Sequence, residues 1–175
     1  MKARKKARKK KRSIAPKGVN ERVYTPPDLA ADIVVHFKPS GRILEPCSGK
    51  GAFLDALREQ CGYLSVAHCE IDEGIDFFVR TDAVDWIVTN PPWGPKFRGF
   101  LLHSMDLADN IVFLANMNVW DTKCRRREIA EAGFGVVEIL TVDTPPPPWP
   151  QQGFQLAATW LKRGWTGSTH IHALP

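Results

Sequence analysis

The sequence has no long apolar run. Nothing in its 175 residues approaches the length of a membrane-spanning helix, and the segment after the first twelve residues, SIAPKGVNERV, is too polar for the core of a signal peptide. We therefore expect a cytoplasmic protein that makes no membrane contact. Because 43% of the residues are hydrophobic and the chain is short for two domains, one globular core is expected.

Cysteine and histidine are scarce and scattered. The four cysteines show no close pairing, and at least two lie in apolar runs typical of strands, so free thiols are expected rather than disulfides or zinc ligands. Of the five histidines, His170 and His172 alone are near neighbours, and they lie in a weakly patterned end of the chain. The sequence predicts no metal site.

Acidic side chains are absent from the first twelve residues, MKARKKARKKKR, which hold 9 of the 24 lysines and arginines. Residues 13–175 hold 15 basic against 19 acidic residues, so the tail carries a charge of +9 and the remainder −4. Such a run repels itself and buries nothing. Residues 1–17 are therefore predicted to be a disordered basic tail that contacts nucleic-acid phosphates, with a solubility or localisation tag as the alternative.

From residue 23 onward, strand-like and helix-like segments alternate. Strands are expected in RILEP, GYLSVAHCEI, DWIVT, NIVFLANM, GVVEILTV and FQLAATWLKR, and helices in the segments between most of them. The spacing of Thr25, Pro26 and Asp28 predicts that Thr25 caps the first helix. This alternation is typical of an α/β fold with a doubly wound, parallel sheet and helices on both faces.

The unusual polar residues follow the predicted strands. EPCSGKG comes after the first strand, Glu70 after the second, Asp76 in the next turn, and NPPW after what would be the fourth. In a doubly wound sheet, ligands bind beyond the carboxyl ends of the strands. These residues are therefore expected to form one site.

The turn EPCSGKG predicts a nucleoside site. Gly49 and Gly51 would let the backbone approach a ligand closely, although a tight turn is the alternative. The turn is not a phosphate loop, because Lys50 is followed by glycine, and Leu54 replaces the third glycine of a dinucleotide fingerprint. Glu70, 19 residues past Gly51, suits ribose hydroxyls in a ligand without pyrophosphate, such as S-adenosylmethionine.

The motifs VYTPP, EPCSGKGAF, CEID, DFF and TNPPW, in this order within residues 23–161, resemble those of bacterial and phage N6-adenine DNA methyltransferases, within the wider amino-methyltransferases. The resemblance implies a Rossmann-like class I methyltransferase domain over residues 18–165, followed by a C-terminal tail over 166–175. It also implies a seven-stranded, mostly parallel sheet whose last strand, FQLAATWLKR, is antiparallel.

The same resemblance implies S-adenosylmethionine as the cofactor and assigns its contacts. The methionine end would lie against Tyr24 and Thr25, the ribose against Glu70, and the adenine ring against Asp76 and Phe77. The glycine turn would line the cofactor through Glu45, Cys47, Gly49 and Gly51. Three alternatives stay open: Glu45 caps the next helix, Asp72 replaces Glu70, or Phe77 or Phe78 belongs to the core.

The segment Asn90, Pro91, Pro92 and Trp93 carries the predicted catalytic residues. The prolines end the strand and stiffen the chain. The side-chain carbonyl of Asn90 and the backbone carbonyl of Pro91 would accept both hydrogens of an exocyclic amine, which frees the nitrogen lone pair, while Trp93 would stack on a flipped base. A strand-ending turn with a core tryptophan is the alternative interpretation.

Trp93 favours adenine in DNA as the acceptor, because relatives that methylate glutamine amides usually carry tyrosine there and several RNA enzymes carry Phe or Tyr. The chain offers no separate segment for sequence recognition. Relaxed specificity or dependence on a partner subunit is therefore expected. RNA or protein-amide methylation, and a catalytically silent nucleic-acid-binding subunit, are the alternatives.

Overall fold

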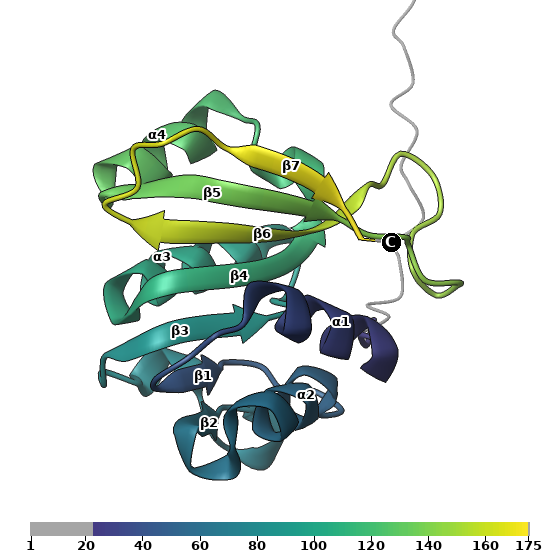
Figure 1. The fold of residues 1–175 in the computed structure, drawn as a ribbon, viewed down its shortest axis with the longest axis vertical. Helices are drawn as coiled ribbons and strands as arrows, with labels where there is room; N and C mark the ends of the chain where they lie inside the picture. The colour runs from purple at the N-terminus through teal and green to yellow at the C-terminus, as the bar shows by residue number, and fades with distance from the viewer. Residues whose placement is uncertain (1–22, 175) are drawn as a thin grey trace, which may run out of the picture.

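Seven strands among residues 23–174 form one mixed sheet in the spatial order β2-β1-β3-β4-β6-β5-β7 (Figure 1). The computed structural model describes residues 23–174, so the predicted basic tail, residues 1–17, lies outside the described part of the chain. The strands are β1 Ile43–Glu45, β2 Val66–His68, β3 Val84–Thr89, β4 Ala108–Asn116, β5 Phe134–Thr141, β6 Leu156–Arg163 and β7 His170–Ala173.

Four α-helices connect the strands within this range: α1 Pro27–Phe37, α2 Ala52–Cys61, α3 Phe97–Leu107 and α4 Lys123–Glu131. Short 3-10 turns fill several connections, among them η2 Ile71–Glu73, η3 Phe77–Val79, η4 Gly94–Lys96 and η5 Met117–Val119. None of the helices in residues 23–174 combines the length and apolar character required to cross a membrane.

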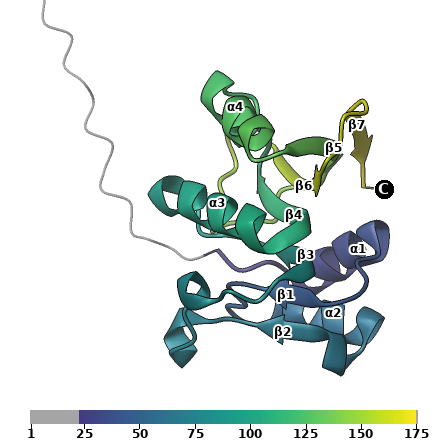
Figure 2. The same cartoon turned by 90° about the vertical axis from the view of Figure 1, so that its left-hand side faces the viewer.

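The helices cover both faces of the sheet, as the sequence predicts. Figure 2 shows α1 and α2 on one side and α3 and α4 on the other. The central strands supply both cores: Trp86 and Val88 of β3 join the cluster under α1 and α2, whereas Ile87 joins the cluster under α3 and α4. Burial on both faces explains why the central strands are continuous apolar runs.

The pairing directions confirm most of the predicted topology. Strands β2, β1, β3 and β4 are parallel to one another, whereas β6 is antiparallel to both β4 and β5. The segment FQLAATWLKR, predicted to be antiparallel, is therefore β6. It is not the last strand, because β7 follows it and pairs in parallel with β5.

Strand β7 lies within residues 166–175, which the sequence assigned to a tail. All four of its residues are exposed, so it lacks the apolar alternation that marks a strand in sequence. It is held by backbone pairing with β5 and by Thr141 Oγ1, which donates to the carbonyl of His172 at 3.0 Å. The folded unit therefore extends past residue 165.

Two further expectations are wrong in detail. Helix α1 starts at Pro27 without a side-chain cap, because the Thr25 hydroxyl is engaged elsewhere. The chain between β2 and β3 forms the turns η2 and η3 and no strand. Asn90 therefore follows the third strand in chain order, where the sequence placed it after a fourth.

Candidate active site

The predicted site residues meet at the carboxyl ends of β1, β2 and β3. These three strands are adjacent and parallel, so the chain leaves all of them at the same edge of the sheet. The glycine turn follows β1 and is tied to the end of β2, since Ser48 N donates to the carbonyl of Cys69 at 3.0 Å. Asn90 follows β3 directly.

Glu45 joins the ends of β1 and β3 from inside the protein. Its Oε1 accepts hydrogen bonds from Thr89 Oγ1 at 2.5 Å and from the backbone N of Cys47 at 3.1 Å. The side chain is 1% exposed, and this burial, more than the nearby Glu70 charge, raises its pKa to about 8. Glu45 thus holds the two strand ends together and does not cap α2, the alternative its position allowed.

Cys47 extends this network toward Asn90. Its Sγ lies 3.0 Å from Thr89 Oγ1 and donates to the backbone carbonyl of Asn90 at 3.4 Å. Burial, followed by the neighbouring Glu45, raises the pKa of the Cys47 thiol. The thiol therefore stays protonated and serves as a hydrogen-bond donor rather than a nucleophile.

The glycine turn lies against Glu70 and Tyr24. Gly49 has a left-handed φ of +54°, and its N–H donates to Glu70 Oε2 at 2.6 Å. A Cβ at Gly49 would lie 3.2 Å from the Tyr24 ring, so only glycine fits this approach without displacing the ring. Of the two candidate ribose acids, Glu70 is buried at the turn and Asp72 is exposed.

Asp76 and Phe77 lie apart from this cluster. Asp76 Oδ1 accepts from the backbone N of Phe78 at 2.9 Å, and so begins η3. Phe77 is buried and its ring stacks on Phe100 at 5.1 Å, which favours its role as a core residue. Phe78 is half-exposed. The backbone bridge between Glu70 and Ile75 ties the start of this segment to Glu70.

The amide of Asn90 is oriented by Thr25. Asn90 Nδ2 donates to Thr25 Oγ1 at 3.2 Å, so the hydroxyl that was expected to cap α1 instead fixes one end of this amide. The other end, Oδ1, is buried and has no hydrogen-bond partner among residues 23–174. Because a buried carbonyl without a partner is costly, this oxygen is placed to accept a hydrogen bond from a ligand.

Trp93 is held in an aromatic cluster that the sequence did not predict. Its ring lies 5.4 Å from Trp149 and 5.1 Å from Phe154, both from the proline-rich segment between β5 and β6. Trp149 Nε1 donates to the backbone carbonyl of Tyr24 at 3.3 Å. The segment PPPPWPQQGF thus contacts both Trp93, which follows β3, and Tyr24, which lies against the glycine turn.

Thr89 and Trp149 are the functional candidates that sequence reasoning missed. A signal existed for Thr89, since a threonine that ends a buried strand directly before Asn90 has to place its hydroxyl among the turns. Trp149 stood in a polyproline segment. Its role depends on a contact 125 residues away along the chain, which no local pattern indicates.

Comparison with known proteins finds similar folds among solved structures but no match in sequence. The chain matches no protein-family model and no curated protein sequence. Solved structures do match it. A Pyrococcus horikoshii protein assigned as an RNA methyltransferase superposes with a TM-score of 0.55 at 18% identity, over 82% of this chain and 87% of that one.

Two other similar structures are a Listeria monocytogenes protein assigned as a class I S-adenosylmethionine-dependent methyltransferase and the M protein of the type I restriction enzyme EcoKI. Their TM-scores are 0.57 and 0.55, at 12% and 14% identity, over 84% and 82% of this chain. The match spans 63% of the Listeria protein and only 44% of the M protein. The chain therefore has the α/β, Rossmann-like fold of class I methyltransferases.

The buried Glu45 makes stability depend on pH. Its pKa in the folded protein, about 8, lies above the ordinary value of 4.5, so the native state binds this proton more tightly than the unfolded chain does. The free energy of unfolding is therefore expected to decrease as the pH rises from 4.5 to about 8. Glu45→Gln keeps an acceptor oxygen for Thr89 and removes this titration.

Calorimetric unfolding across about pH 5 to 9 measures this difference. The Tm of the wild type should fall more steeply with pH than the Tm of Glu45→Gln, and the curves should converge at the acidic end. Parallel curves over the whole range would show that Glu45 does not titrate in this window.

Proposed function

We propose that this protein is an S-adenosylmethionine-dependent methyltransferase that acts on the exocyclic N6 amine of adenine in DNA. The observation that carries the proposal is the state of the Asn90 amide. One end is hydrogen bonded to Thr25, and the buried Oδ1 has no partner within residues 23–174. An amine with two hydrogens is the complement of this acceptor and the adjacent backbone carbonyl of Pro91.

The residues present fit the proposed cofactor. The missing side chain of Gly49 lets the Tyr24 ring lie against the glycine turn, and the Glu70 carboxylate lies at the same turn. Each Glu70 oxygen accepts one backbone N–H, from Gly49 and Asp72, and an ionised carboxylate has further lone pairs for ribose hydroxyls. Tyr24, Thr25 and Asp76 complete the proposed contacts, while Glu45 and Cys47 support the turn from behind and the buried Phe77 belongs to the core.

When bound, S-adenosylmethionine supplies a methyl group that is electrophilic because it is attached to a sulfonium. The part of the protein is to prepare the accepting nitrogen. By accepting hydrogen bonds from both N–H groups of the amine, Asn90 Oδ1 and the Pro91 carbonyl favour a pyramidal nitrogen with an available lone pair. Pro91 and Pro92 fix the separation of these acceptors, and Trp93 stacks on the base. The nitrogen releases its proton after transfer, so no strong base is required.

DNA is the preferred acceptor because Trp93 ends the motif, and likeness to the EcoKI M protein supports it. RNA is the second candidate, since the Pyrococcus horikoshii protein of similar fold is assigned as an RNA methyltransferase. Because the elements described over residues 23–174 all belong to the sheet, its covering helices and their connections, we propose relaxed specificity or a partner subunit that reads the sequence. The basic residues 1–17 would add salt-sensitive affinity for phosphates.

The test is transfer of labelled methyl groups to unmethylated DNA, with RNA and protein as parallel acceptors. Label is expected as N6-methyladenine in DNA. Asn90→Ala should reduce the rate by roughly 100-fold or more, because it removes an acceptor aimed at the reacting amine, while the affinity for S-adenosylmethionine stays near that of the wild type. Label found only in RNA or only in glutamine would show that DNA is not the acceptor. Equal rates for the wild type and Asn90→Ala would show that Asn90 takes no part in the chemistry.

Gly49→Ala tests the cofactor site. Its Cβ would press on the Tyr24 ring at 3.2 Å, so the affinity for S-adenosylmethionine, measured by titration calorimetry, should fall roughly tenfold or more. Gly62→Ala is the matched control, because Gly62 also has a left-handed φ, +86°, but a Cβ there meets nothing within 4 Å. Equal affinities for the two variants would place the cofactor elsewhere.

A further inference from the structure

Basic residues gather on the folded part of the chain near the first turns of α3 and α4. Although residues 13–175 carry a net negative charge, this region holds a cluster of cations: Lys96, Arg98, Lys123, Arg125, Arg126 and Arg127. Within residues 23–174 only Asp121 and Glu128 form ion pairs with them. This surface is therefore a local reversal of the charge of the domain.

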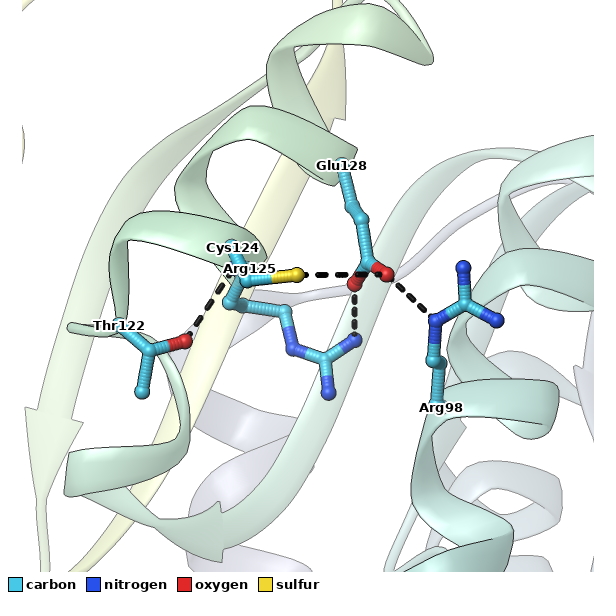
Figure 3. Close-up of polar contacts among 5 residues, drawn as sticks. All are labelled: Arg98, Thr122, Cys124, Arg125 and Glu128. Carbon is cyan, nitrogen blue, oxygen red and sulfur yellow. Dashed lines mark hydrogen bonds and ion pairs between the residues drawn. The ribbon is translucent and has the colours of Figure 1, made fainter.

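Glu128 ties two of these arginines together across the two helices. Its Oε1 accepts from Arg98 Nε of α3 at 2.5 Å, and its Oε2 accepts from Arg125 Nη1 of α4 at 2.8 Å (Figure 3). Thr122 Oγ1 accepts from the backbone N of Arg125 and so caps α4. The Arg98 hydrogen bond, more than the charges, lowers the pKa of Glu128, so the bridging carboxylate is ionised.

The bridge leaves donors on both arginines. Arg98 is 62% exposed and uses only Nε within residues 23–174, so its two terminal nitrogens point away from Glu128 toward solvent (Figure 3). Arg125 lies over the Phe97 ring at 5.2 Å, and its Nε is buried without a partner. A guanidinium pair held in fixed positions with spare N–H groups is a suitable receptor for a phosphate.

This cluster borders the proposed base site. A cavity of about 290 Å³ is lined by Trp93, Phe97, Asn116, Thr122, Arg125 and Phe154. Arg125 and the stacking residue Trp93 thus line the same cavity. In a nucleic acid, the phosphates that flank a base are attached to it through one sugar, so a base held at Trp93 has its own backbone nearby.

We propose that the Arg98–Glu128–Arg125 cluster binds the phosphodiester next to the accepted base, with Glu128 as the positioning residue for both arginines. This inference rests on the proposed function, since it takes the base to lie at Trp93. It assigns the contact with the acceptor strand to the folded domain, in addition to the basic tail. A purely structural role does not account for the Arg98 end of the bridge, which is 62% exposed, because solvent-exposed ion pairs add little stability.

The test uses short duplexes with one A·T pair among G·C pairs, in which single phosphates around the adenine are replaced by neutral methylphosphonates. Affinities are measured by competition for the full-length wild type, Arg98→Gln and Arg42→Gln. Arg42 is the matched control, because it is 68% exposed, pairs with Asp85 at 3.6 Å, and lies at the amino end of β1. Thermal unfolding verifies that each variant is folded.

In the wild type and in Arg42→Gln, one neutral linkage beside the adenine should weaken binding roughly threefold to tenfold. In Arg98→Gln the same linkage should have a clearly smaller effect, because one of the two arginines that bind this phosphate is already gone. Arg127→Gln, an exposed residue outside the bridge, should behave like the control. An equal loss of affinity at every neutral linkage, in the wild type and in all variants, would overturn the proposal.

Methyl transfer to the single adenine, measured with the same wild-type protein, tests the proposed function separately. If methyl transfer occurs but the neutral linkage weakens binding equally in Arg98→Gln and Arg42→Gln, only the phosphate contact is overturned. If Arg98→Gln reduces the cost of the neutral linkage but no methyl group is transferred to adenine, the phosphate contact is supported and the proposed reaction is overturned.

Discussion

The hydrogen bond between Glu45 and Thr89 is the constraint on which the rest of the site depends. It fastens the ends of two neighbouring parallel strands, β1 and β3, at the edge where the glycine turn and Asn90 begin. Cys47 then bonds to both Thr89 and the Asn90 carbonyl, so the glycine turn and the Asn90 segment share one buried polar network. Since such networks are rigid when satisfied, the distance between the two halves of the site is fixed by the protein interior.

Much of this arrangement could be predicted from sequence because it follows from periodicity and strand order. Parallel strands end at one edge, so polar residues after successive strands had to meet, and Glu45, Glu70 and Asn90 do lie there. The antiparallel β6 was also predictable, since no helix separates it from β5. These inferences need only the chain direction and the covering helices.

The rest depended on contacts that local patterns do not encode. Thr25 has the spacing of a helix cap, yet a tertiary bond to Asn90 competes for its hydroxyl and wins. Strand β7 is exposed on all four residues and is held by backbone pairing with β5 and a hydrogen bond from Thr141 Oγ1. Trp149 hydrogen bonds locally through its backbone, with Pro146 and Gln151, whereas its indole contacts Trp93 and Tyr24, which lie far away in the sequence.

In the proposed function, Trp149 contacts both the cofactor position at Tyr24 and the base position at Trp93. Its indole touches the aromatic ring at one position and hydrogen bonds to the backbone of Tyr24 at the other. A ligand that displaces Tyr24 must also move Trp149 or break this bond, and so changes the packing around Trp93. The proposed function therefore implies that occupancy of one position would alter the free energy of filling the other, and by thermodynamic reciprocity the influence would be equal in both directions.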